Sequence, residues 1–352
     1  MPWLRLALVP GVSPLAQRAL LDEYKTPQAV LAAPMRDIEA RAGRSVALAL
    51  ARGPIEDLVE RTRRWCEDPD HHVLALADAR YPKALRAIAD PPPVLYARGR
   101  VDLLDAPSIA IVGSRNATAQ GQRDAEAFAR ELSSAGLCIV SGMALGIDAA
   151  AHRGGLAAMG SSVAVLGTGI DIVYPRGNRD LAHSLAATGC LVSEFPLGTP
   201  SLSGNFPRRN RLISGLARGV LVVEAGKPSG SLITARFALE QGREVFAIPG
   251  SIHSALSKGC NDLIKQGARL VEEANEILEE LRWGTRLAPR AEPDADAPDP
   301  FLESMGFAPT SPDQIAQRTG IAAKSVAAQL SLLEIEGRIA SLPGGLFQRV
   351  QR

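Results

Sequence analysis

Three arginines and an aromatic ring fall within six consecutive positions of this sequence, in the segment FPRRNR. Guanidinium groups bind phosphate oxygens, and an aromatic ring is a platform on which a nucleobase stacks. Together these groups hold a single nucleic-acid strand without reading its sequence, whereas a duplex would leave the ring unused. The candidate binding residues of this segment are Asn205, Phe206, Arg208, Arg209, Asn210 and Arg211, with the two asparagines orienting the site.

The arginines should lie at the start of a helix, which we expect over residues 210–217. Cations at a helix N-terminus oppose the helix dipole, and a polyanionic ligand would remove that conflict. Two other interpretations stay open. Phe206 could be an ordinary core residue, and the arginines could be solvated charges or partners of Asp171 and Glu194.

Two further short segments have the composition of phosphate-binding loops. Each is rich in Gly and Ser and is expected to lie between a strand and a helix, where free backbone N–H groups attract anions. Their members are Gly113, Ser114 and Arg115, and Ser229, Gly230 and Ser231. A third such loop, Ser141–Gly142, leads toward Asp148 and His152, which we interpret as a helix-stabilising pair at i, i+4 spacing. The loops predict one anion-binding rim.

Familiar nucleotide fingerprints are missing from these loops. A Walker A loop needs GK[ST], and a dinucleotide fold needs GxGxxG after its first strand, but neither follows the strand expected at 108–112. Asp148 and His152 have no third ligand at a suitable spacing for a metal. We therefore expect no cofactor, no metal and no catalytic residue.

Composition limits the remaining possibilities. The chain has 352 residues, of which 46% are hydrophobic and 22% charged, with a formal net charge of +1. It contains no apolar run long enough for a membrane span and no recognisable signal peptide. Four widely spaced cysteines favour a reducing compartment, so we expect a cytoplasmic protein without membrane contact. Because the net charge is small, any polyanion site must come from local clustering.

The central part of the chain alternates β-rich runs with helical patterns, which indicates βαβ units. The fold class expected from these units is α/β, a Rossmann-like, doubly wound and mostly parallel sheet, over residues 69–284. The expected strands are 108–112, 137–140, 163–166, 190–192, 219–223 and 244–248.

Two smaller domains are expected to flank the sheet. Residues 1–68 have helical spacing, and the segment Leu8–Ser13 approximates the turn of a helix-hairpin-helix or SAM-like domain, which could bind DNA or simply pack helices. Residues 285–299 have the Pro, Ala and Asp content of a flexible linker. Residues 300–352 predict a winged helix with a wing at 343–345. Its candidate recognition helix carries only Lys324 as a cation, which favours a protein contact over groove reading.

The order of these motifs resembles the DNA-processing protein A family of bacteria, also called DprA or Smf. The resemblance covers about two thirds of the chain in one order. It is carried by YPKALRAIADPPPVLYARG at 81–99, GSR at 113–115, SGMALGIDAAAH at 141–152, LGTGIDIVYP at 166–175, LVSEFP at 191–196, FPRRNRLISGL at 206–216, VVEA at 222–225, SGSLITA at 229–235, and IPGS and KGCNDLIKQGA within 248–268.

The resemblance implies a non-catalytic protein that binds single-stranded DNA during natural transformation, protects it and loads the RecA recombinase, acting as a homodimer in the cytoplasm. It implies phosphate contacts for Arg115, Arg209 and Arg211 and a base platform for Phe206. The backbone of 113–114 and 229–231 would add phosphate nests. Many members carry a lysine shortly before the FP pair, but this chain has Ser201-Leu202-Ser203-Gly204, so part of that charge is missing or comes from Arg208.

Two other functions stay open on sequence grounds. Related Rossmann-like folds include nucleoside-monophosphate hydrolases, for which Glu194 or Glu224 would be the catalytic acid. Alternatively, the terminal domains could bind proteins while the centre acts as a scaffold.

Overall fold

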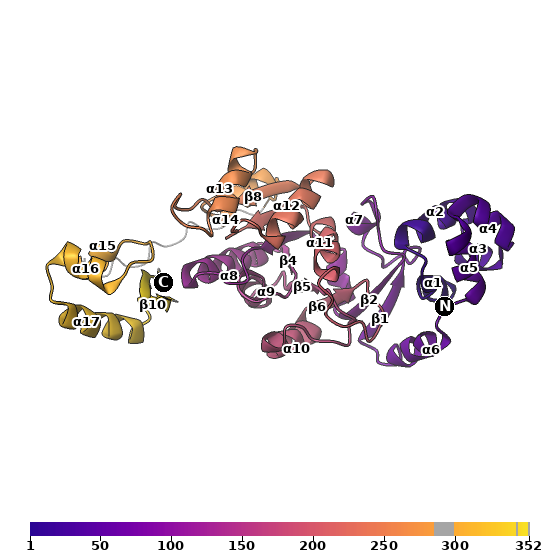
Figure 1. Ribbon diagram of the computed structural model, residues 1–352, viewed down its shortest axis with the longest axis horizontal. Helices are drawn as coiled ribbons and strands as arrows, with labels where there is room; N and C mark the ends of the chain where they lie inside the picture. The colour runs from indigo at the N-terminus through magenta and orange to yellow at the C-terminus, as the bar shows by residue number, and fades with distance from the viewer. Residues whose placement is uncertain (285–298, 343, 351–352) are drawn as a thin grey trace.

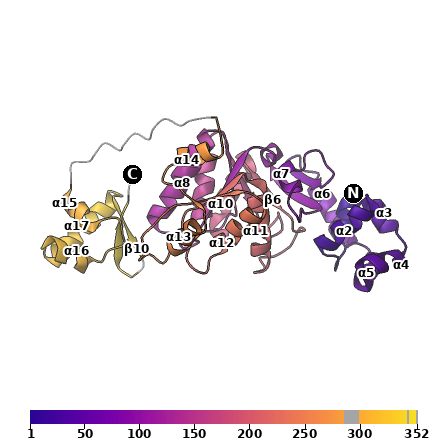
Figure 2. The same ribbon diagram turned by 90° about the horizontal axis from the view of Figure 1, so that it is seen from above.

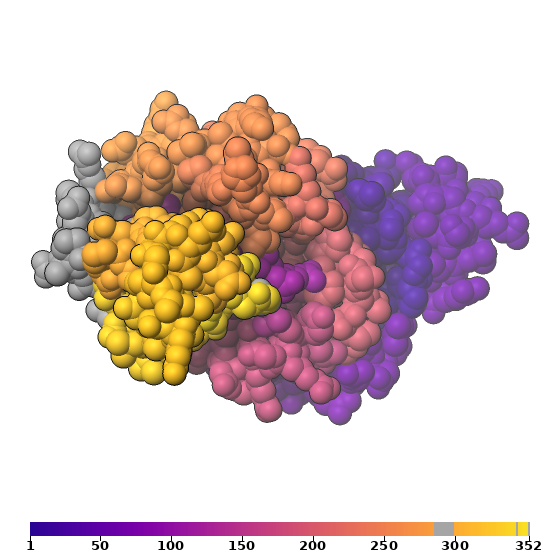
Figure 3. Space-filling view, turned by 60° about the vertical axis from the view of Figure 1, so that its left-hand side comes forward, coloured from indigo at the N-terminus to yellow at the C-terminus, as the bar shows by residue number. Residues whose placement is uncertain are grey.

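A computed structural model describes residues 1–284, 299–342 and 344–350. The molecule is elongated, with a helical body at the N-terminal end, a sheet domain in the middle and a small C-terminal body at the other end (Figures 1 and 2). In the space-filling view the yellow C-terminal residues form a rounded body of their own in front of the sheet domain (Figure 3).

The central sheet has nine strands in the order β1-β2-β6-β5-β4-β3-β7-β8-β9. Strands β3 to β9 pair in parallel with one another, whereas β1 and β2 form an antiparallel edge beyond β6. The strands are β1 His71–Ala75, β2 Val94–Gly99, β3 Ser108–Val112, β4 Cys138–Ser141, β5 Ser162–Val165, β6 Cys190–Ser193, β7 Gly219–Val222, β8 Glu244–Ala247 and β9 Arg269–Leu270. The expected mostly parallel, doubly wound sheet is confirmed, with strand ends within one residue of the expected ones.

Helices cover both faces of this sheet, which explains why β3 to β7 are buried along their whole length. On one face lie α8 Ala119–Ser134, α9 Ile147–Leu156, α10 Arg179–Thr188 and α14 Ala274–Glu280. On the other lie α7 Lys83–Arg86, α11 Asn205–Leu216, α12 Gly230–Glu240 and α13 Lys258–Lys265. Short 3-10 turns, η1 Val101–Leu104 and η2 Arg176–Asn178, complete the domain.

Six helices precede the sheet: α1 Pro2–Ala7, α2 Pro14–Tyr24, α3 Pro27–Ala32, α4 Met35–Ala42, α5 Arg44–Arg52 and α6 Glu56–Trp65. The segment expected to be a hairpin turn lies between α1 and α2, where the Ser13 side chain accepts a hydrogen bond from Ala16 N and begins α2. The α6 helix packs against the antiparallel edge of the sheet, and the Trp65 ring stacks on His71 with centroids 4.3 Å apart. Whether the α1–α2 turn binds DNA stays a prediction.

The C-terminal body is the expected winged helix. It comprises α15 Pro300–Met305, α16 Pro312–Thr319, α17 Ala323–Ile335 and the antiparallel pair β10 Ile339–Leu342 and β11 Leu346–Arg349. Ser311 and Gln314 form a capping box at the start of α16, and Gly320 ends that helix with φ of 70°. The expected linker at 285–299 lies outside the described residues except for Asp299, as does Pro343 of the wing.

One expected helix boundary is wrong. The helix expected at 210–217 begins at Asn205, before the FP pair, because Pro207 is tolerated in the first turn of a helix. The three arginines therefore lie along the first two turns of α11, where a helix directs successive side chains to different sides.

Candidate single-strand binding pocket

A pocket of about 670 Å³ opens beyond the carboxyl ends of the central strands. The chain builds strands outward from β3 to β6 and then returns to place β7 on the other side of β3. Such a switch point opens a crevice at the strand ends, where parallel sheets bind ligands. The pocket walls come from the loop after β3, the start of α11, and the segment from the end of β7 to the start of α12.

Most of the predicted binding residues meet in this pocket. Nine of them line it: Gly113, Ser114, Arg115, Phe206, Arg209, Asn210, Ser229, Gly230 and Ser231. The other three, Asn205, Arg208 and Arg211, are not among its lining residues. The fold thus brings together three segments that are spread over residues 113–231 of the chain.

The loop after β3 sits close against α9. A methyl group added to Gly113 would lie 2.6 Å from Ile147 Cγ1, and one added to Gly146 would lie 2.3 Å from Ser114 O. Both positions therefore require glycine. The close contact turns Arg115 outward, where its side chain is exposed at the pocket with its guanidinium 5.7 Å from the centre of the Phe206 ring. Arg115 is thus placed to meet a ligand phosphate.

Arg209 occupies the pocket floor and is only 4% exposed. Its guanidinium donates to the backbone carbonyls of Gly142 and Val165. Burial lowers the pKa of Arg209 to about 10, a shift opposed by Asp148, so the group remains a cation near neutral pH. The floor therefore carries one fixed positive charge, held by backbone carbonyls.

The loop from Ser141 to Gly146 is braced by Asp148 and His152. Asp148 accepts from the backbone N–H groups of Gly142, at 3.1 Å, and Ala144, at 3.3 Å. His152 Nε2 accepts from Met143 N at 3.2 Å, while its Nδ1 contacts Ser162 Oγ at 2.7 Å. The expectation that these two residues stabilise α9 as a pair is wrong, because their partners lie in the loop and in β5.

Stability should fall in mild acid because of His152. Burial, assisted by the charge of Arg209, lowers the pKa of His152 to about 3, against 6.5 for the free side chain. The contribution of the neutral ring is therefore fully present above pH 6.5 and is lost as the pH falls toward 3, by at most about 1.4 kcal/mol per pH unit. Urea unfolding of the wild type and of His152→Gln between pH 7 and 5 measures this, and we expect the flatter slope in the variant. Parallel slopes would contradict the assignment.

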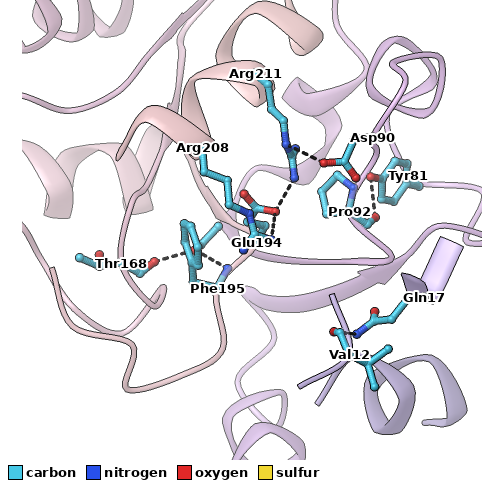
Figure 4. A network of polar contacts seen from close by, with 11 residues as sticks. Val12, Gln17, Tyr81, Asp90, Pro92, Thr168, Glu194, Phe195, Arg208 and Arg211 are labelled. Atoms are coloured by element: carbon cyan, nitrogen blue, oxygen red, sulfur yellow. Dashed lines mark hydrogen bonds and ion pairs between the residues drawn. The ribbon is translucent and has the colours of Figure 1, made fainter. Parts of the chain in front are cut away.

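Arg208 and Arg211 are not among the pocket's lining residues and instead contact acidic side chains (Figure 4). Glu194 Oε2 accepts from Arg208 at 2.9 Å and from Arg211 at 2.6 Å, and Asp90 lies 3.3 Å from Arg211 Nε. The Glu194 and Arg211 side chains are almost fully buried, at 1% and 8% exposure. Protein carboxylates therefore offset these two cations, and the argument that all three arginines need a polyanion fails. DNA contacts for Arg208, Arg211 and Asn205 stay a prediction.

Phe206 is half-buried at the pocket wall. Its ring lies against Gly167, where an added methyl group would be 2.6 Å from Phe206 Cδ1. The Tyr174 ring packs beside it with centroids 5.4 Å apart and a tilt of 38°. Phe206 is thus neither a core residue nor a freely exposed one, and its position depends on the missing side chain at Gly167.

The start of α12 forms the opposite wall. Ser229 Oγ accepts from Ser231 N at 3.3 Å and lies 2.7 Å from Ser231 Oγ. Gly230 is exposed, and an added methyl group would meet no atom within 4 Å. Asn210 of α11 donates to Gly230 O at 3.1 Å and ties the two helices together. The partial positive charge of the α12 N-terminus therefore adds to that of Arg115 and Arg209.

The two candidate catalytic acids have other partners. Glu194 belongs to the arginine network described above, and Glu224 accepts from Thr118 N at 2.9 Å and from Thr118 Oγ1 at 2.6 Å. Burial raises the pKa of both carboxyls, and neither side chain lines the pocket. Within the described ranges, no group of three or more His, Cys, Asp or Glu residues could hold a metal.

Several pocket residues were missed at the sequence level. Tyr174, Ser201 and Ser203 are exposed and line the rim, and Asn116 and Thr234 also contribute. The two serines occupy the stretch where the resemblance leads one to expect a lysine. Tyr174 belongs to the LGTGIDIVYP segment, and an aromatic residue at the end of a Gly-rich loop after a predicted strand was the signal that the sequence offered.

Family models match most of the chain. The model described as DNA recombination-mediator protein A matches residues 72–282, and the DprA winged helix domain model matches residues 285–345. Protein Smf of Escherichia coli is 46% identical over 305 residues, covering 84% of this chain and 81% of that protein. DNA processing protein DprA of Streptococcus pneumoniae is 45% identical over 209 residues, covering 59% of this chain and 74% of that protein.

Solved structures show the same relationship. The DprA structure from Streptococcus pneumoniae aligns with a TM-score of 0.69 at 36% identity, covering 78% of this chain and 95% of that one. DNA processing protein A of Helicobacter pylori, described with a unique single-stranded DNA binding mode, aligns with a TM-score of 0.55 at 30% identity, covering 60% and 95%. Among the described helices, none is both long and apolar enough to cross a bilayer.

Proposed function

The chain belongs to the DNA recombination-mediator protein A family, which includes the DprA and Smf proteins, and from that membership we propose that its pocket binds single-stranded DNA. One observation carries the proposal: Arg115, Arg209 and the start of α12 converge on a single open pocket with an aromatic wall. Cations and helix N-termini hold phosphates, and rings hold bases. The description of the Helicobacter pylori relative supports the same ligand.

The proposal assigns each pocket residue a contact with either the phosphates or the bases of the strand. Arg115, being exposed, contacts a backbone phosphate directly, and Arg209 supplies a fixed charge beneath it. The backbone of 229–231 at the N-terminus of α12 holds a second phosphate, with Ser229 Oγ releasing Ser231 N to it, and Phe206 supports a base. Arg208 and Arg211 also hold α11 through their shared ion pair with Glu194, while DNA contacts for these two arginines and for Asn205 remain part of the prediction.

Family membership also supports finer roles. We propose that the bound strand is incoming DNA during natural transformation, that the protein protects it and loads a RecA-type recombinase onto it, and that it acts without catalysis as a homodimer in the cytoplasm. The domain limits of 1–68, 69–284, 285–299 and 300–352 are part of this proposal, with the winged helix as a protein-binding module.

A salt titration of Arg115→Gln tests the proposal. The wild type should bind an oligo-dT strand more tightly than a duplex of equal length. The variant should lose about tenfold in affinity for the strand, since a charge-assisted hydrogen bond contributes about 1.5–3 kcal/mol. Its salt dependence, the slope of log K against log salt, should become shallower by about 0.7.

Arg218→Gln is the matched control, because Arg218 is an exposed arginine that precedes β7, at the opposite end of the strands. It should bind like the wild type. Equal affinity of the wild type for strand and duplex, or equal losses in the two variants, would overturn the proposed function.

A further inference from the structure

A second aromatic ring stands beside Phe206, and its position suggests a path for the strand. Resting on the function proposed above, we propose that Tyr174 carries the nucleotide next to the one at Phe206, and that the strand leaves the pocket over Tyr174 toward Arg176. The inference names a further base-binding residue and an exit direction for the same site.

The contacts around the two rings favour one base stacked on each ring over a single base held between them. The Phe206 and Tyr174 centroids are 5.4 Å apart. The two rings already pack against each other at this distance, so no base can lie between them. Phe206 is also covered by Gly167 and approached by Arg115, whereas Tyr174 is 44% exposed and lines the pocket. Tyr174 therefore offers the more open ring face.

The loop that carries Tyr174 is fixed at both ends. Near its start, Thr168 Oγ1 donates to Ile172 O at 2.8 Å. At its end, Asn178 is buried and its Nδ2 donates to Met143 O at 2.9 Å and to Ala144 O at 3.2 Å. Asn178 thereby ties the loop to the braced segment of the pocket wall. A ring held in place before binding loses little conformational freedom when a base stacks on it.

Free positive charge lies on the Tyr174 side of the pocket. Arg176 is exposed, and among the described residues it has no carboxylate partner at ion-pair distance. It lies two positions after the lining residue Tyr174, and a methyl group at the neighbouring Gly177 would lie 3.8 Å from Leu145, the residue after the lining residue Ala144. On the α12 side, the charge of Lys227 is engaged by Asp262 in an ion pair, and Lys258 at the start of α13 is an exposed cation. A phosphate leaving the pocket therefore meets an available cation beside Tyr174.

Comparing a normal with an abasic strand separates base stacking from backbone contact. The full-length protein is titrated with a dT oligonucleotide and with an abasic oligonucleotide of equal length. Tyr174→Ala should bind the dT strand about tenfold more weakly, the effect of losing one stacked base, and the abasic strand within twofold of wild type. Tyr174→Phe keeps the ring and should restore dT binding.

Arg176→Gln should weaken binding of both strands equally and make the salt slope shallower by about 0.7. Arg218→Gln again serves as the control and should change neither. If the wild type binds dT but Tyr174→Ala loses nothing, or loses equally on both strands, the inference is overturned while the proposed function stands. If the wild type does not prefer single strands at all, the proposed function itself fails.

Discussion

Replacing Arg209 with alanine is expected to lower the free energy of unfolding by about 3 kcal/mol or more. The substitution leaves two buried carbonyls, those of Gly142 and Val165, without their charged donor. It also removes the charge of Arg209, which lowers the pKa of Asp148 against the raising effect of burial. Buried polar or charged groups that lose their partners cause some of the largest losses in the free energy of unfolding.

Chemical denaturation measures this loss, and strand binding should be recorded only where the variant is still folded. Under those conditions we expect weaker binding too, because the Gly142 loop loses its anchor. Arg115→Gln is the matched comparison, since it removes a pocket arginine that is exposed and should leave unfolding unchanged within about 0.5 kcal/mol. A stable Arg209→Ala protein that had lost only DNA affinity would show that Arg209 acts through the ligand and not through the fold.

Glu194→Ala should also be destabilising, by about 2–3 kcal/mol, because it leaves the buried guanidinium of Arg211 with Asp90 as its one carboxylate partner and removes the partner of Arg208. The double variant Glu194→Ala/Arg211→Ala should lose less than the sum of the two single variants, since the pair is removed together. Thermal or urea unfolding of the four proteins gives the coupling energy.

Glu126→Ala provides the control for an accessible carboxylate. Glu126 pairs with Arg130 and Arg153 at 32% exposure, so its loss should cost less than about 1 kcal/mol. Additive effects of Glu194→Ala and Arg211→Ala, or a Glu194 variant as stable as that of Glu126, would contradict the assignment of Glu194 to the support of α11.

Six of the nine strands, β3 to β8, could be predicted from the sequence because each is a short run of mostly apolar, often β-branched residues, whereas the antiparallel pair β1 and β2 and the exposed two-residue strand β9 were not expected. Runs of this kind, such as Ser108–Val112, have few alternatives once helical patterns separate them. The convergence of three loops on one pocket also followed from topology, since the carboxyl ends of parallel strands meet at one edge.

Which arginine lines the pocket and which pair with carboxylates could not be predicted in the same way. A helix turns each successive residue by about 100°, so an error in where α11 begins changes which guanidinium faces the pocket. The burial of Arg209 and the pairing of Arg211 with Asp90 depend on contacts far along the chain. The prediction for Asp148 and His152 was wrong for a related reason. Their i, i+4 spacing suggested that they contact each other, but both accept hydrogen bonds from backbone N–H groups of the loop before α9.

The pocket owes its shape to absent side chains. Gly113, Gly142, Gly146 and Gly167 each sit where one extra carbon would strike Ile147, Arg209, Ser114 or Phe206. Substitutions should therefore be poorly tolerated at these four glycines and much better tolerated at the exposed rim of the pocket. Ser201 and Ser203, solvent-facing and uncrowded by such constraints, are the places where affinity can be tuned by adding charge.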